Sequence, residues 1–169
     1  MSAHNRYPLP ADARTPQLGL TDEARHSVAN LLAARLADVY VLLVKTRQCH
    51  WNVTGPVFAE MHEFFGEQYE QLNDMADELA ERIRQLGFLA PGSMVEFIRL
   101  ATLREHPADA MSPTAMTQAL LADHEALIQL LRADIETCGQ LGDAGNADEL
   151  TVHMKALEKS AWMLRAHMS

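Results

Sequence analysis

The chain has 169 residues, of which 48% are hydrophobic and 22% charged, and its 23 acidic and 14 basic side chains give a formal charge of −9. This length fits one domain with its own hydrophobic core, and the composition excludes disorder over the whole chain. The acidic surplus argues against a nucleic-acid binder, whose affinity depends on neutralising phosphates, and favours the attraction of cations.

The first 20 residues are predicted to form a flexible N-terminal tail. Pro8, Pro10 and Pro16 oppose a helix there, and few apolar side chains could dock the segment on a core. No apolar stretch typical of a secretory signal occurs in it, so a cytoplasmic protein is the expectation.

The first helix is predicted from Thr21, a suitable N-cap residue, to about Trp51. Asp22 and Glu23 then lie in the first turn, where carboxylates suit the helix dipole. Apolar residues recur at helical spacing along this stretch, at Val28, Leu32, Leu36, Val39 and Leu43. The longest continuous apolar run, 39–44, is too short to span a bilayer, so no membrane association is expected.

Glycine and proline residues divide the rest of the chain into further helices. Gly55-Pro56 breaks the first helix, and Ser112-Pro113 is an N-cap and first-turn pair that opens another. Gly139, Gly142 and Gly145 are expected to mark a turn before the last helix. The predicted bounds are 56–86, 94–103 (a short helix), 112–138 and 147–167.

Four long helices with one long connection predict an all-α four-helix bundle over residues 21–169, with a short helix in the crossover between the second and third long helices. Cys49 and Cys138 lie far apart without a C-x-x-C pair, so reduced thiols are expected rather than a disulfide or a zinc ribbon.

The helix predicted over 56–86 carries acidic residues at alternating spacings of four and three, which places them in one stripe. They are Glu63, Glu67, Glu70, Asp74, Asp77 and Glu81. A solvated helix face is the ordinary interpretation. His62 beside the stripe and Asp77 at its apolar border favour a partly buried metal site, because imidazole and carboxylate together suit iron, manganese or zinc.

His50 continues the apolar stripe of the first helix, where a histidine is usually a hydrogen-bonded core residue. Because His62 and the acidic residues are expected nearby, His50 becomes a second candidate ligand. His62 and Asp77 are 15 residues apart, about 22 Å along one helix, and cannot share a metal within one chain. Two copies packed antiparallel about a twofold axis near residues 69–70 would bring His62 of one copy to Asp77 of the other.

A conventional di-iron centre inside one bundle needs two Glu-x-x-His motifs, and only Glu23 to His26 fits, near a helix start. This argues against a bacterioferritin or manganese-catalase type of bundle.

Several segments resemble the Dps miniferritins, which are ferritin-like proteins. The likeness covers about residues 18–167 and rests on KTRQCHWNVTGP (45–56), MHEFFGEQY (61–69), DELAERIRQLG (77–87), ADHEALI (122–128) and EKSAWMLR (158–165). The resemblance implies a bacterial, cytoplasmic ferritin-like bundle that assembles into a hollow shell of twelve subunits. Such shells oxidise Fe(II), preferably with hydrogen peroxide, and store ferric mineral, which protects against oxidative stress.

By the same resemblance, His50 and His62 of one subunit and Asp77 and Glu81 of its mate would form the ferroxidase site that binds iron, or other divalent metals. One position departs from the family, which has an acidic residue where this chain has Gly66. Glu67 is adjacent but about 100° around the helix, which makes it a doubtful substitute. The expectation is that the iron position near His62 is weakened.

Asp143, Asp148 and Glu149 lie where the family lines its threefold pores, although helix capping explains acids there equally well. Trp51, next to His50, is expected to pack in the core rather than over the metal site.

DNA protection and nucleoid association are the other family activity and usually rely on a lysine-rich tail. This tail has Arg6 and Arg14 but no lysine, so direct DNA binding is not expected. A DNA-protecting or structural shell with an impaired ferroxidase site remains the alternative to a working ferroxidase.

Overall fold

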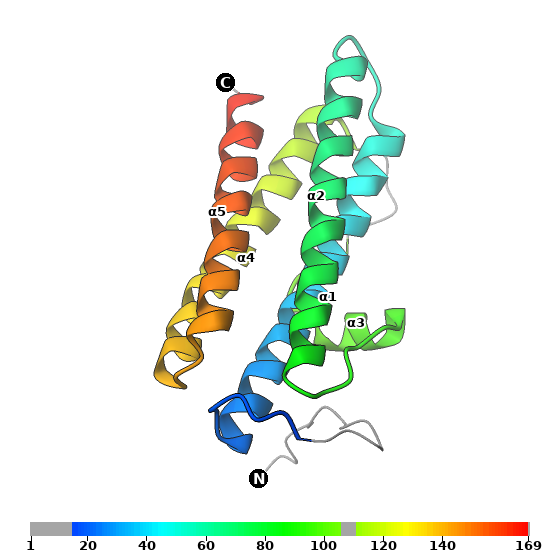
Figure 1. The fold of residues 1–169 in the computed structure, drawn as a ribbon. Helices are drawn as coiled ribbons and strands as arrows, with labels where there is room; N and C mark the ends of the chain where they lie inside the picture. Colours follow the sequence, from blue (N-terminus) through cyan, green and yellow to red (C-terminus); the bar gives the residue numbers. More distant parts are fainter. Residues whose placement is uncertain (1–14, 106–110, 169) are drawn as a thin grey trace.

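The computed structural model describes residues 15–105 and 111–168, which contain five helices and no strand. They are α1 (Asp22–Asn52), α2 (Phe58–Gln85), α3 (Met94–Leu100), α4 (Pro113–Gln140) and α5 (Ala144–Ala166). α1 and α2 form one antiparallel pair, α4 and α5 form a second, and α3 lies in the crossover that joins them (Figure 1). The predicted bundle is confirmed; residues 1–14 of the predicted tail lie outside the described residues.

The helix starts follow the capping residues. Thr21 accepts a hydrogen bond from the N–H of Ala24 (3.1 Å), and Ser112 accepts one from Ala115 (3.2 Å). Both were predicted N-caps.

Two helices begin at other residues than predicted. The helix predicted to begin at Pro56 begins at Phe58, because Pro56 lies in a turn closed by the bond from the Phe58 N–H to the Gly55 carbonyl (3.1 Å). α5 begins earlier than predicted because Asp143 caps it, and Gly145 therefore lies inside the helix rather than in the turn. Gly142, with φ of +75°, makes the turn.

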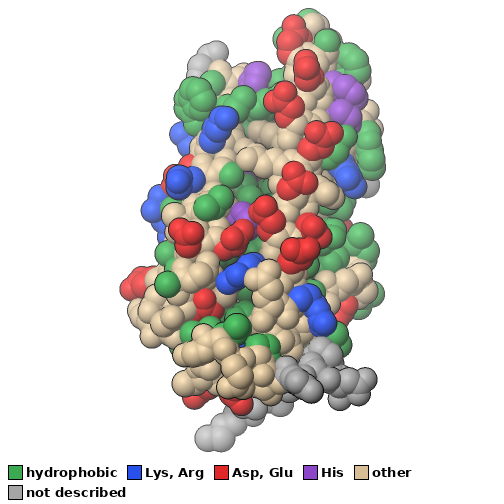
Figure 2. Space-filling view, viewed as in Figure 1, with side chains coloured by type: hydrophobic (Ala, Val, Ile, Leu, Met, Phe, Trp, Pro, Cys, Tyr) green, Lys and Arg blue, Asp and Glu red, His purple; other side chains and the backbone are tan. Residues whose placement is uncertain are grey.

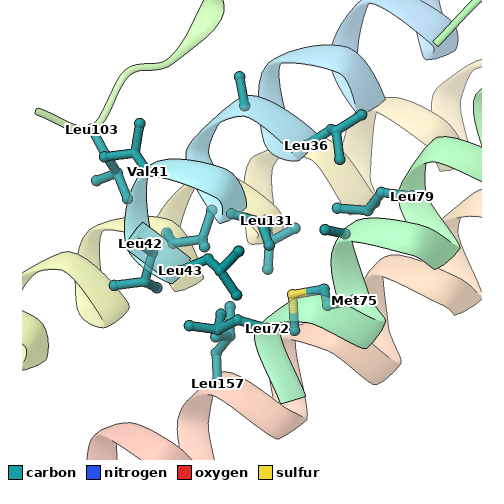
Figure 3. Close-up of a cluster of buried hydrophobic side chains, with 14 of the residues drawn as sticks. Leu36, Val41, Leu42, Leu43, Leu72, Met75, Leu79, Leu103, Leu131 and Leu157 are labelled. Carbon is teal, nitrogen blue, oxygen red and sulfur yellow. The ribbon is translucent and has the colours of Figure 1, made fainter. Parts of the chain in front are cut away.

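The core is built from leucine-rich faces of all four long helices. Figure 3 shows side chains from α1, α2, α4 and α5 pointing toward one another, together with one from the crossover. The labelled members are Leu36, Val41, Leu42, Leu43, Leu72, Met75, Leu79, Leu103, Leu131 and Leu157. The burial of this apolar surface is the main stabilising contribution to the bundle.

By length and composition α1 is long and apolar enough to cross a membrane, but most of its apolar part is buried inside the bundle. The sequence prediction considered only the continuous run 39–44 and underrated this helix. Its burial is the ordinary behaviour of a core helix.

Gly87 ends α2 in a conformation that favours glycine. Its φ is +93°, and a Cβ there would lie 2.8 Å from Cδ of Pro16. The end of α2 therefore holds the described segment before α1, and Leu20 of that segment packs against the core.

Both cysteines are free and buried, which confirms the prediction of thiols without a disulfide. Burial raises the pKa of Cys49 to about 11 and that of Cys138 to about 12. Neither thiol is a reactive thiolate near neutral pH.

A buried charged cluster ties α1 to α4 and to the crossover. Arg35 lies 3.3 Å from Asp38 and 3.3 Å from Asp134, and one Asp38 oxygen accepts bonds from the N–H groups of Thr102 (2.6 Å) and Leu103 (2.8 Å). Burial raises the pKa of Asp134 to about 6, against the opposing charge of Arg35.

Asp134→Asn is expected to flatten the pH dependence of stability between about pH 4 and pH 6. The pKa of about 6 in the fold lies above the ordinary value of 3.8, so the protonated carboxyl stabilises the fold below pH 4, and this contribution is lost as pH rises through 6. A shift of that size corresponds to about 2–3 kcal/mol. Unfolding midpoints at several pH values, with Glu136→Gln on the exposed face of α4 as the control, measure it. Equal slopes in wild type and Asp134→Asn would contradict it.

Candidate metal centre

His50 and His62 face each other where α1 ends and α2 begins. Nδ1 of His50 lies 2.6 Å from the His62 carbonyl oxygen, and Nδ1 of His62 lies 2.8 Å from the His50 carbonyl oxygen. A carbonyl oxygen only accepts, so each Nδ1 carries the proton and donates it. In the neutral imidazoles Nε2 then keeps its lone pair, which is the form that binds a metal.

Aromatic contacts fix the planes of these two rings. The imidazoles stack with centroids 3.7 Å apart, Phe58 stacks on His62 at 5.1 Å, and Tyr69 and His50 form a T-shaped pair at 5.2 Å. Arg47 lies over the Tyr69 ring at 5.0 Å. The pair is therefore oriented before any metal binds, as a ligand pair needs to be.

Gly66 lies directly against this pair. A Cβ on it would be 3.4 Å from Cε1 and 3.5 Å from Nδ1 of His50. A side chain at position 66 would thus touch His50, whereas the neighbouring Glu67 is exposed.

The predicted acidic ligands are not brought to the histidines within one chain. Asp77 and Glu81 are exposed on α2, and Asp77 lies about 22 Å along the helix from His62. The whole predicted stripe on α2 is exposed, and Figure 2 shows acidic side chains gathered along the face formed by α2 and α5. The site remains a prediction that needs a second copy of the chain.

Exposed apolar side chains surround the histidines. Trp51 is 70% exposed, and Val57 and Phe58 are close to half exposed. The prediction that Trp51 packs in the core is wrong: His50 faces α2, and the next residue points about 100° away. An apolar surface of this kind is typical of a protein–protein interface.

The predicted pore residues have different roles in the chain. Asp143 is buried, and its carboxylate caps α5 by accepting bonds from the Asn146 N–H (3.0 Å) and side-chain amide (2.6 Å). Asp148 is exposed. Glu149 lies beside His153, with 3.5 Å between its oxygen and the ring Nε2. Capping and pore lining can hold together, so a pore role remains a prediction for Asp143, Asp148 and Glu149.

His153 and Glu78, which meet Glu149 between α5 and α2, were not predicted as site residues from the sequence. The spacing of four residues from Glu149 to His153 was a visible signal, because it places both on one helix face. The contribution of Glu78 depends on packing between helices.

Residues 29–169 match the family model described as a ferritin-like domain. An uncharacterized low temperature-induced protein of Nostoc sp. is 49% identical over 150 residues, covering 88% of this chain and 84% of that protein. A DNA protection during starvation protein of Agrobacterium fabrum is 33% identical over 149 residues, covering 88% and 92% of the two chains. The crystal structure of the Dps protein from Vibrio cholerae O1 has a TM-score of 0.87 and 31% identity, covering 94% of this chain and 100% of that one. With the bundle, the family match and these relatives in agreement, the chain belongs to the Dps family of ferritin-like proteins.

Proposed function

We propose that the protein oxidises Fe(II) with hydrogen peroxide at sites shared between two subunits, and stores the ferric product inside a hollow shell of twelve chains. The observation that carries this is the reciprocal hydrogen bonding of His50 and His62, which leaves both Nε2 lone pairs available for a metal. His50 and His62 of one subunit would act with Asp77 and Glu81 of its mate, and iron is the substrate.

Two imidazoles and two carboxylates suit Fe(II) and other divalent first-row metals. In the proposed reaction, each of two Fe(II) ions gives one electron to one hydrogen peroxide molecule, whose O–O bond breaks. Its oxygens leave as water or hydroxide, and the two Fe(III) ions hydrolyse to ferric oxyhydroxide with release of protons. The carboxylates offset the positive charge that builds up on oxidation, while the histidines fix the geometry.

Assembly into a homo-oligomer is supported by the exposed apolar side chains next to the histidines, Trp51 and Phe58 among them. The exposed acidic face of α2 and α5 would attract Fe(II) toward the shell interior (Figure 2). Asp143, Asp148 and Glu149 are proposed to line the route inward. A cytoplasmic location suits this activity, and the net charge of −9 opposes direct DNA binding.

The second candidate function is a DNA-protecting or structural shell with an impaired ferroxidase site. Gly66 favours it, because its place against His50 is where an acidic side chain would reach the metal. Fe(II) oxidation by the protein at the rate of a working ferroxidase would exclude this second function.

The test is anaerobic loading of the shell with Fe(II), followed by peroxide. We expect ferric absorbance to develop at about one peroxide per two Fe(II), with the mineral retained by the protein on gel filtration at the size of the shell. Free ferric precipitate at the same rate as in protein-free buffer would refute the proposal.

A further inference from the structure

His153 is a buried imidazole between two carboxylates. Its exposed fraction is 3%, and its Nε2 is buried without a hydrogen-bond partner among the described residues. Oε1 of Glu149, one turn earlier on α5, lies 3.5 Å from Nε2, and Oε2 of Glu78 on α2 lies 3.7 Å from Nδ1.

These separations are too long or too poorly aligned for hydrogen bonds. Burial lowers the pKa of His153, and this effect is larger than the rise in pKa caused by the negative charge of Glu149. The neutral ring is therefore favoured near pH 7. A neutral imidazole has a proton on one nitrogen and a lone pair on the other. Since a carboxylate faces each nitrogen, the lone pair on the second nitrogen is directed at an anion. This is unfavourable unless the carboxyl is protonated or a metal cation lies between the two groups.

We propose that His153, Glu149 and Glu78 bind a divalent transition-metal cation between α5 and α2. One ligand atom from each residue can be chosen so that all lie within 4.8 Å of one another. Metal–ligand distances of about 2.0–2.2 Å place neighbouring ligands about 3–3.5 Å apart, so a small rotation of the side chains closes the set. The Glu78 side chain is 56% exposed and free to make that movement.

Three protein ligands leave further coordination positions to water. Glu149 and Glu78 are on the solvent side of the buried ring, which gives a cation access from the acidic face shown in Figure 2. Because one nitrogen and two carboxylates form the ligand set, Fe(II), Mn(II), Co(II) and Zn(II) are the expected class. The site is complete within one chain and does not depend on the shared site of His50.

Binding of Co(II) to the assembled protein tests the proposal. Equilibrium dialysis is expected to show, in addition to the Co(II) held at the shared site of His50, one further class of site per chain. The affinity of this further class is expected to fall about tenfold or more in Glu149→Gln and in His153→Gln. Asp74→Asn removes one negative charge near Glu78 but leaves all three proposed ligands in place, and it is expected to keep the wild-type affinity within about twofold. Because His153 is buried, its substitution can unfold the protein. If His153→Gln does not fold, the affinity of Glu149→Gln alone decides the test.

The variant His50→Ala separates this site from the proposed ferroxidase site. It is expected to retain the Co(II) that Glu149→Gln loses, and a crystal soaked in Co(II) is expected to show an anomalous peak between α2 and α5. If Glu149→Gln and His153→Gln bind Co(II) like Asp74→Asn, or if the crystal shows no peak there, the proposal is wrong even when iron oxidation is normal.

Discussion

We expect the rate of Fe(II) oxidation to fall by a factor of about ten or more in shells made only of His50→Ala chains. The same fall is expected in shells made only of Asp77→Asn chains. Shells assembled from an equal mixture of the two chains are expected to recover about a quarter of the wild-type rate. Each single variant removes one ligand from every site, whereas mixing restores some complete sites.

The recovery follows from twofold symmetry. In a pair containing one chain of each kind, one shared site carries both substitutions and the other carries neither. Random mixing makes about half of the pairs mixed, and each mixed pair has one intact site of two, which gives about a quarter of all sites.

Stopped-flow measurement of ferric absorbance after peroxide addition gives the rates, with mixing done by co-expression. Asp74→Asn, an acid of the same exposed stripe that is not a proposed ligand, is the control for loss of charge. Mixed shells that stay as inactive as the single variants would show that His50 and Asp77 do not act across an interface between two chains.

The helices could be predicted because their signals are local. Thr21 and Ser112 cap helices from their own side chains, and the apolar period along α1 spans the whole helix. The start of α5 was misplaced because Gly145 resembles a helix breaker, whereas the Asp143 cap satisfies the first turn of the helix and tolerates a glycine there.

The candidate site could be predicted only in part. The residue pattern identified His50, His62 and Asp77 as candidate ligands, and the spacing of His62 and Asp77 excluded that these two share a metal within one chain. The reciprocal hydrogen bonds between the histidines depend on how residues 53–57 turn the end of α1 onto the start of α2, which no local pattern specifies. The pairing of His153 with Glu78 has the same cause, since it requires α2 and α5 to pack in one particular register.

Gly66→Asp is the change with the largest expected gain. A carboxylate at this position would lie against the His50 ring. A Cβ added to Gly66 would be 3.4 Å from Cε1 of His50, which is an ordinary van der Waals contact and needs no displacement of the backbone. The added negative ligand should raise tight Fe(II) binding from one to two ions per site and speed peroxide-dependent oxidation about tenfold, a barrier reduction of about 1.4 kcal/mol.

Gly66→Ala is the matched control, since it fills the same space without adding a ligand. It is expected to stabilise α2 by about 0.5–1 kcal/mol, because glycine is unfavourable in a helix interior, and to leave iron stoichiometry unchanged. Anaerobic Fe(II) titration by calorimetry and stopped-flow oxidation measure both variants.

Two tightly bound Fe(II) ions per site in the wild type would mean that Gly66 does not weaken the second position. Identical iron binding in Gly66→Asp and Gly66→Ala would show that a side chain at position 66 does not reach the metal. A gain confined to Gly66→Asp would instead identify the missing carboxylate, rather than the flexibility of a helical glycine, as what limits the ferroxidase site of this chain.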